Sequence, residues 1–238
     1  MNEGGIYVIG RGRAFFRPEN HKGFFELGNV SGMSIKMKTE KKQHFSSAGG
    51  VLKTDKELLS RISASFSFVL DDLKDETLCA YFLAPVQKNT DTFFEVTLET
   101  EAGSFFYPLG FKEIEALHIT DESGEIEFQE GTDYLIDKKN GLLQTLSSGN
   151  INERTLKARG DAAPKSLLRM KAGKSLSVCG DFMFVGDFAA GKSMSIRGFA
   201  SIMPDSELAV VSNDWSSLSF FGSFYAKDEK NGLFEVCR

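Results

Sequence analysis

The fold is decided by one stretch of the chain, residues 33–70, which reads MSIKMKTEKKQHFSSAGGVLKTDKELLSRISASFSFVL. Its first part alternates as a β-strand does. Met33, Ile35 and Met37 fall on one face, and the residues between them are polar. A strand with one apolar and one wettable side indicates a sheet that covers a core on one face only.

The second part of the stretch, residues 60–70, alternates in the same way, with Ala64, Phe66 and Phe68 opposite serines. The segment between the two strands is polar and contains glycine. A tight hairpin needs only two to about five connecting residues. We therefore expect a long inter-strand loop over about residues 41–59.

Short strand patterns with Gly, Asn and Asp between them fill most of the remaining sequence. We expect them at residues 93–99, 116–120, 125–129, 142–146, 175–185, 194–203, 208–212 and 218–225. A single helix is predicted at about residues 73–84, with Asp71 or Asp72 as its cap and Pro85 after its end. The chain is therefore expected to be mainly β, an antiparallel β-sandwich or barrel with one flanking α-helix.

No change in composition marks a domain boundary, so the sequence predicts one domain over residues 1–238. Residues 149–165 are polar and resemble either an ordinary long connection or a linker. With 238 residues, 41% of them hydrophobic, the chain is long enough to bury a substantial core.

A formal net charge of −5 argues against a protein whose main task is to hold nucleic acid through its phosphates. No run of eighteen apolar residues is present, and the N-terminal apolar run is too short for a signal peptide. The three cysteines are far apart in sequence and form no C-x-x-C pair. We expect reduced thiols, no membrane association and synthesis in the cytoplasm.

The sharpest motif match is GDFAAGKS, residues 186–193, which fits the phosphate-binding pattern G-x-x-x-x-G-K-[ST]. A working phosphate loop follows a strand and opens a helix, so that backbone N–H groups converge on the phosphates. The residues after Lys192 alternate as a strand instead. The match therefore indicates a hairpin turn.

The other reactive side chains form no recognisable catalytic or metal motif. His21, His44 and His118 have no partner at a known spacing, and the acid pair Glu125 and Glu127 lies on one strand face. We expect a protein that is not an enzyme and that needs no cofactor or metal.

Four stretches, taken in order, resemble a known family. They are LGNVSGMSIKMKTEKKQHFSSAGGVLKTDKEL (27–58), SRISASFSFVLDDLKDETLCAYFLA (60–84), EFQEGTDYLIDKKNGLLQTL (127–146) and GFASIMPDSELAVVSNDWSSLSFFGSFYA (198–226). The first carries a Gly-Asn turn, a strand and a His-aromatic-Ser-Ser step, and the last carries Trp215 after an Asn-Asp turn. Together they resemble the major tail tube proteins of long-tailed bacteriophages.

The resemblance implies a β-sandwich subunit that forms rings, expected to be hexameric, in which each subunit contributes strands to a shared inner barrel. The rings then stack into the tail tube, the conduit through which genome DNA is ejected into the host. Pairing the edge of each sheet with that of a neighbouring subunit would also remove exposed strand edges, which otherwise promote aggregation.

The polar sides of the two alternating strands would then face the channel. The expected lumen-facing positions are Ser34, Lys36, Lys38, Glu40, Ser63, Ser65 and Ser67. The long loop would lie on the adjacent ring and become ordered there. The expected inter-ring contacts are Lys41, Lys42, His44, Phe45, Ser46, Ser47, Lys53 and Asp55.

The implied partners are further copies of the same chain and the tape-measure, tail-tip and terminator proteins of the tail. DNA would pass without sequence-specific binding, and the subunit would be assembled in the host cytoplasm and reside in the virion. Two alternatives stay open. One is a tube-like subunit of a phage-derived particle or injection apparatus. The other is a carbohydrate-binding or adhesion β-sandwich, in which exposed Trp and Tyr side chains would stack against sugar rings.

Overall fold

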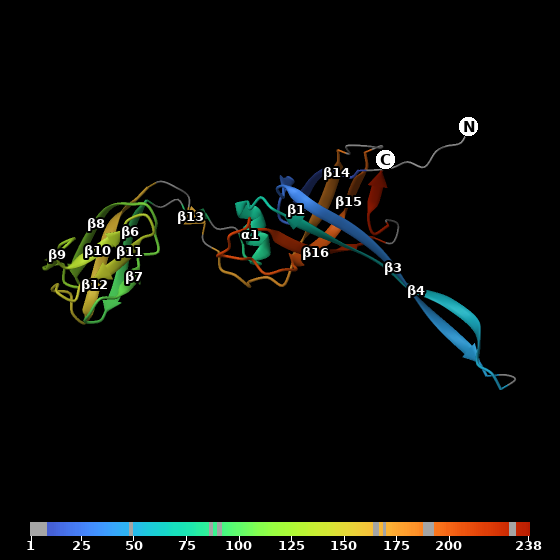
Figure 1. Ribbon diagram of the computed structural model, residues 1–238, viewed down its shortest axis with the longest axis horizontal. Helices are drawn as coiled ribbons and strands as arrows, with labels where there is room; N and C mark the ends of the chain where they lie inside the picture. Colours follow the sequence, from blue (N-terminus) through green and yellow to red (C-terminus); the bar gives the residue numbers. More distant parts are fainter. Residues whose placement is uncertain are drawn as a thin grey trace. The chain divides into compact units, whose positions relative to one another are not determined.

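The computed structural model describes residues 9–47, 50–85, 88–89, 92–163, 167–168, 170–187, 193–228 and 232–238. It is mainly β, with antiparallel sheets and one short helix in the described residues, which confirms the predicted fold class (Figure 1). The chain divides into two compact units, Met1–Val86 with Met170–Arg238 (unit 1) and Gln87–Arg169 (unit 2). The sequence pattern, read as one domain, did not anticipate this division.

Unit 1 is built on an eight-stranded sheet of order β2-β1-β14-β15-β16-β4-β3, with β17 paired to β15. The strands are β1 (Gly12–Pro18), β2 (Phe25–Glu26), β3 (Val30–Ser46), β4 (Lys53–Leu70), β14 (Val178–Gly186), β15 (Ser195–Pro204), β16 (Leu218–Tyr225) and β17 (Glu235–Cys237). Residues of β1 and β3, which stand near opposite ends of this order, line one cavity of about 310 Å³. The sheet therefore curls toward a barrel.

The core of unit 1 lies on the inner face of this sheet, where alternate residues of β4, β14 and β16 are aromatic. Phe66 lies at its centre, with ring centroids 4.5 Å from both Phe182 and Phe224. Opposite Phe66 in the ladder is Gly222, at which an added Cβ would meet the Phe66 ring at 2.3 Å. Only glycine leaves room for the ring there, so aromatic packing fixes the register of β4 against β16.

The single helix of the described residues, α1 (Asp75–Tyr81), is shorter than the predicted 73–84. Its N-cap is Lys74, whose backbone N–H donates to the Thr77 hydroxyl at 3.0 Å, and not Asp71 or Asp72. The helix ends before Leu83, which adopts a positive φ of 51°. The Tyr81 ring packs edge-on against Phe220, so α1 covers the end of the sheet where β16 begins.

Unit 2 is a small sandwich of a four-stranded sheet, order β6-β12-β8-β9, and a three-stranded sheet, order β10-β11-β7. Their bounds are β6 (Phe93–Thr100), β7 (Phe106–Pro108), β8 (Ile114–Asp121), β9 (Glu127–Phe128), β10 (Tyr134–Asp137), β11 (Leu142–Thr145) and β12 (Arg154–Ala162). Buried side chains of both sheets form a separate core. The short strands β5 (Lys88–Asn89) and β13 (Leu167–Leu168) pair where the chain enters and leaves unit 2.

Two further expectations are wrong in detail. Residues 149–165, predicted as a connection, contain β12, a central strand of unit 2 that pairs with both β6 and β8. Residues 208–212, predicted as a strand, lie in the connection between β15 and β16. The remaining predicted strands occur with shifts of a few residues at their ends.

Candidate functional site

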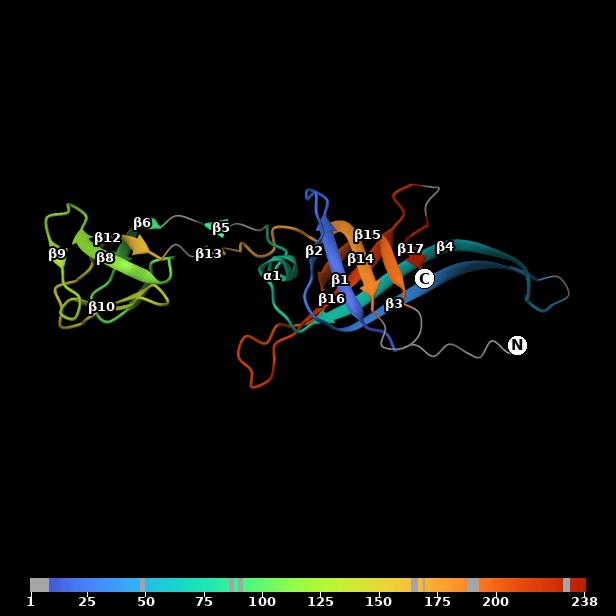
Figure 2. The ribbon, with the colours of Figure 1, turned by 90° about the horizontal axis from the view of Figure 1, so that it is seen from above.

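The most distinctive feature of unit 1 is the length of the β3–β4 hairpin. β16 pairs with β4 only from Ala64 to Leu70, whereas β3 and β4 stay paired with each other as far as Ser46 and Lys53. Residues 39–62, here named the arm, therefore extend beyond the sheet as a two-stranded ribbon (Figures 1 and 2). The long loop predicted at 41–59 is wrong, because most of it is strand and the connection spans only residues 47–52.

Cross-strand contacts explain why this polar segment forms strands. The Lys41 ammonium lies 2.6 Å from the carboxylate of Glu57, which also accepts a hydrogen bond from Gln43 at 3.2 Å. His44 Nδ1 lies 2.6 Å from the Asp55 carboxylate. These hydrogen bonds lower the pKa of Glu57, that from Lys41 most. Cross-strand pairs of this kind offset the weak strand preference of lysine and glutamate.

One face of the hairpin is rich in hydroxyl groups and cations. The register places Ser34 opposite Ser67, Lys36 opposite Ser65, and Lys38 opposite Ser63. All seven positions predicted to face a lumen therefore lie on one side of the hairpin, because directly opposed residues share a face. Whether that face lines a channel stays a prediction.

The same face continues along the arm and becomes more basic. It carries Lys42 opposite Leu58 and His44 opposite Lys56, and it ends with Lys53 opposite Ser46. Near its middle the Lys38 ammonium bonds the Glu40 carboxylate at 3.1 Å, and this contact lowers the pKa of Glu40. We call this side of the hairpin, from Lys36 to Lys53, the basic face.

The opposite face of the arm carries apolar side chains that no part of the described chain covers. Ile62 and Leu59 continue the core-facing row of β3 and β4 past the end of the barrel, and both are at least half exposed. Met37, opposite Ala64 just before the arm begins, is 54% exposed on the same face. Phe45 lies farther out on the same face and is 51% exposed. The arm thus combines a basic and an apolar side.

The residues predicted to contact an adjacent ring are divided between these faces by the strand alternation. Lys41 and Phe45 lie on the apolar side, and Lys42, His44, Ser46 and Lys53 lie on the basic side. Asp55 occupies a bulge in β4, and Ser47 begins the connection. The ladder of this segment forms between strands of one chain, and its ordering against a neighbouring ring stays a prediction.

The outer edge of the hairpin is open. β3 stands at the end of the strand order, and no strand of the described residues pairs with its free side. An unpaired edge seventeen residues long presents a row of backbone N–H and C=O groups to any chain that can add a strand.

Sequence reasoning missed a second exposed feature, the connection between β15 and β16 (residues 205–217). Val210, Val211 and Trp215 are there 87%, 95% and 97% exposed. The run Ala-Val-Val predicts a strand, and only the flanking acids and the Asn-Asp turn indicate an exposed loop.

The phosphate-loop match lies between two antiparallel neighbours. β14 ends at Gly186 and β15 begins at Ser195, so the motif is followed by a strand rather than a helix, as the sequence pattern predicts. The Gly186 N–H donates to the Met194 carbonyl at 2.9 Å, which closes the hairpin. Residues 188–192, including Lys192, lie outside the described residues.

The described residues contain neither a cluster of potential metal ligands nor a helix that could span a membrane. No group of three or more His, Cys, Asp or Glu side chains lies close enough together there to hold a metal ion. No helix in the same part of the chain has the length and apolarity needed to cross a membrane.

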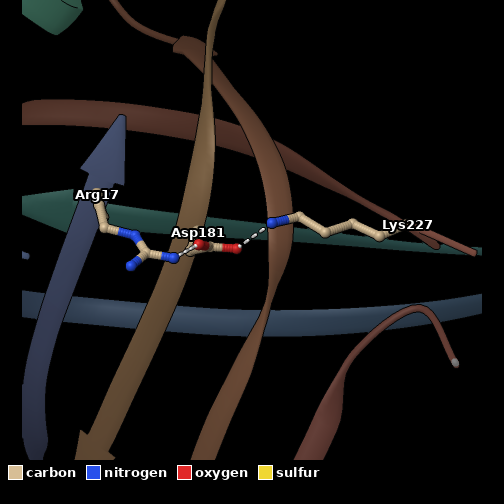
Figure 3. A network of polar contacts seen from close by, with 3 residues as sticks. All are labelled: Arg17, Asp181 and Lys227. Carbon is tan, nitrogen blue, oxygen red and sulfur yellow. Dashed lines mark hydrogen bonds and ion pairs between the residues drawn. The ribbon is translucent and has the colours of Figure 1, made fainter. Parts of the chain in front are cut away.

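The outer face of the unit 1 sheet carries an ionic cluster of Arg17, Asp181 and Lys227 (Figure 3). Arg17 stands opposite Asp181 in the β1–β14 ladder and pairs with its carboxylate, and Lys227 reaches the other carboxylate oxygen at 2.9 Å. Burial alone would raise the pKa of Asp181. The hydrogen bonds from Lys227 and Arg17 outweigh burial and hold that pKa below its usual range.

Asp181→Asn should remove the pH-dependent stabilisation of the fold that this ionic cluster provides. Because the folded-state pKa of Asp181 is lowered, the stabilisation is present above the unfolded-state pKa of about 3.9 and is lost as pH falls through the folded value. We expect the variant to lose about 1–2 kcal/mol of unfolding free energy at pH 7, and we expect this difference from wild type to be smaller at pH 3. Urea denaturation at both pH values measures this, and an equal difference at the two would contradict it.

The structure defines an architectural class of protein. An antiparallel sheet curls toward a barrel, and its strands β3 and β4 extend into an arm with an unpaired edge. A small sandwich, unit 2, is inserted after α1. The chain belongs to the family described as "Protein of unknown function UCP028589", whose model matches residues 7–232. A search of curated proteins found no match.

Proposed function

We propose that the protein is a structural subunit that assembles with further copies of itself into stacked rings, and so into a tube of the kind formed by phage tail tube proteins. The observation that carries the proposal is the β3–β4 hairpin, which runs past the body of unit 1 and leaves the edge of β3 unpaired. An edge of this length is an aggregation hazard unless a partner covers it. Pairing with an identical neighbour covers it and closes a ring.

The two faces of the hairpin support the same proposal. In a barrel shared between subunits, the side with Met33 and Ile35 packs on each subunit's own core, where both residues contact it. The other side, with its serines and lysines, would face the channel and be exposed to water. Hydroxyl groups provide a hydrated lining, and Glu40 offsets part of the charge of Lys38 through their contact.

Under this proposal the partners are copies of the chain and the tape-measure, tail-tip and terminator proteins of a tail, with DNA passing through the channel and no enzymatic step. The protein would reside in the virion after assembly in the host cytoplasm. A subunit of a phage-derived particle or injection apparatus would use the same assembly in another setting.

Negative-stain microscopy of the purified full chain over a range of concentrations tests the proposal. We expect rings or tubes of uniform diameter at high concentration, and sedimentation velocity should show the matching loss of monomer. A chain that stays monomeric up to its solubility limit, at both low and moderate salt, would contradict self-assembly.

A carbohydrate-binding or adhesion role is the candidate from another class, and one observation favours it. Trp215 is 97% exposed, and an exposed indole is a good platform for stacking a sugar ring. Retention of the wild type but not of Trp215→Ala on immobilised polysaccharides, without any self-assembly, would support this role instead.

A further inference from the structure

The connection between β15 and β16 carries an apolar tip on an anchored base. Its first residues are anchored, since the Asp205 N–H donates to the Ser219 carbonyl at 2.9 Å and the Tyr81 hydroxyl donates to the Ser206 carbonyl. Leu208 packs against the core of unit 1. Beyond this base, Val211 and Trp215 are almost wholly exposed, although nothing in the fold requires an indole there.

Acidic side chains flank this tip along the connection. Asp205, Glu207 and Asp214 lie in the same connection, are exposed, and have no hydrogen-bond or ion-pair partner for their carboxylates within the described residues. The tip is therefore an apolar side chain flanked by negative charge.

The arm presents the complementary arrangement. It is hollowed over residues 42–44 and 56–58, with a volume of about 640 Å³, enough for an indole ring. Leu58 lies in this hollow and is 67% exposed, with Lys42 directly opposite it in the ladder. Neither Lys42 nor Lys56 has a carboxylate partner in the part of the chain that the structure describes. Gln43, His44 and Glu57 complete the lining, and each of these three is already bonded within the arm. The hollow thus offers one exposed apolar side chain, Leu58, and two unpaired cations, Lys42 and Lys56.

The tip and the hollow lie at opposite ends of β4. Leu70, the last residue of β4, pairs with Leu218, which directly follows the connection that carries the tip. Leu58 precedes Leu70 by twelve residues, which corresponds to about 40 Å along an extended strand. One copy therefore cannot place its anchored tip in its own hollow, and the contact requires a second copy.

We propose that Trp215, with Val211 beside it, docks into the hollow of the arm of a second copy of this chain, where Asp214 and Glu207 pair with Lys42 and Lys56. The proposal rests on the proposed self-assembly, for which it names the two surfaces joined between successive copies. Contact between unlike surfaces at opposite ends of a subunit repeats head to tail and generates a stack. The lysines also suit the π-face of the indole.

Trp215 is the only tryptophan of the chain, so its fluorescence reports this contact directly. We expect the emission maximum of the full chain to shift to shorter wavelength as protein concentration rises and assembly begins, because the indole leaves water. An interface tryptophan that fills a pocket contributes heavily to affinity. Trp215→Ala should therefore raise the concentration needed for assembly by about 30-fold or more.

Leu176→Ala is the matched control, because Leu176 is 95% exposed but belongs to neither surface, and it should assemble as the wild type does.

The charges of the two surfaces are tested by reversing their signs. Lys42→Glu with Lys56→Glu should prevent stacking, and so should Asp214→Lys with Glu207→Lys. A chain that carries all four changes should recover assembly, which a merely structural role of these side chains would not produce. Circular dichroism identifies any variant that fails to fold.

The outcomes separate this inference from the proposed function. No assembly of the wild type contradicts both. If the wild type assembles without a change in tryptophan emission, or if Trp215→Ala assembles as well as the wild type, the docking contact is overturned and self-assembly still holds. A third outcome is an unchanged tryptophan emission together with loss of binding to a fluorescent DNA duplex in the variant Lys42→Glu with Lys56→Glu. The arm would then bind nucleic acid, and the docking contact would also be overturned.

Discussion

Removing the arm should abolish tube growth and leave a folded subunit. The variant lacks residues 41–59, which is most of the arm, and joins Glu40 to Ser60 through an Asn-Gly turn, which suits a two-residue hairpin. The body should fold because β4 pairs with β16 only from Ala64 onward and every core residue of β4 lies in that part. We expect monomers or isolated rings at concentrations where the wild type forms tubes.

Two measurements decide this prediction. Thermal unfolding, followed by circular dichroism, should show that the truncated chain retains a cooperative transition, which separates loss of assembly from loss of fold. Microscopy then compares the truncated chain with a variant in which only residues 47–52, the connection at the tip of the arm, are replaced by a short turn. Normal tubes from the truncated chain would show that the arm takes no part in stacking.

The two faces of the hairpin could be predicted from sequence because strand alternation has a strict period. Placing Met33 and Phe66 on one side and Ser34 and Ser67 on the other needs no knowledge of partners. The Ser34 and Ser67 hydroxyls indeed meet at 3.0 Å across the strands. The division of the hairpin into an apolar and a polar face thus follows from local pattern alone.

The arm could not be predicted in the same way, because its strands depend on pairs rather than on single residues. Lys41 and Glu57, or His44 and Asp55, have weak strand preference taken one at a time. They are placed symmetrically about the glycines at 49 and 50, so that each basic side chain meets an acid when the strands pair. A search for charges mirrored about a turn would have detected the hairpin.

The strand β12 was missed for a different reason, since its inward side after Leu156 is made of small residues. Gly160 lies beneath the Phe94 ring, and an added Cβ would meet the Ala116 carbonyl at 2.1 Å. Ala158 and Ala162 are its buried neighbours, while Lys157 and Arg159 point outward. Close approach of neighbouring strands thus removes the apolar alternation by which a strand is recognised.

Asp133→Ala should unfold unit 2 locally while unit 1 stays intact. Asp133 is 4% exposed, and its carboxylate accepts hydrogen bonds from the backbone N–H of Gln129 at 2.9 Å and of Asn150 at 2.8 Å. The Asn150 side chain adds a third at 2.8 Å. These bonds, those from the backbone foremost, outweigh burial and lower the pKa of Asp133. The carboxylate thus ties the turn before β10 to the segment before β12.

Alanine would leave two backbone donors without an acceptor in a poorly hydrated site, at about 1–3 kcal/mol each. Asp133→Asn is the matched control, since its amide oxygen can still accept one of these hydrogen bonds. This variant should lose less of the stability of unit 2 than Asp133→Ala does. Hydrogen exchange resolves the two units. Peptides from β6, β8 and β12 should exchange about 30-fold faster or more, and those from β14–β16 should be unchanged. Uniform loss of protection in both units would contradict independent unfolding.

The same variant also tests which unit carries assembly. The open edge of β3, the hollow of the arm and the Trp215 tip all belong to unit 1. If these surfaces suffice to join one copy to the next, Asp133→Ala should still form tubes below the temperature at which unit 2 aggregates. A variant that is locally unfolded in unit 2 and no longer assembles, while its arm and β16 keep their protection from exchange, would instead place an essential contact on unit 2.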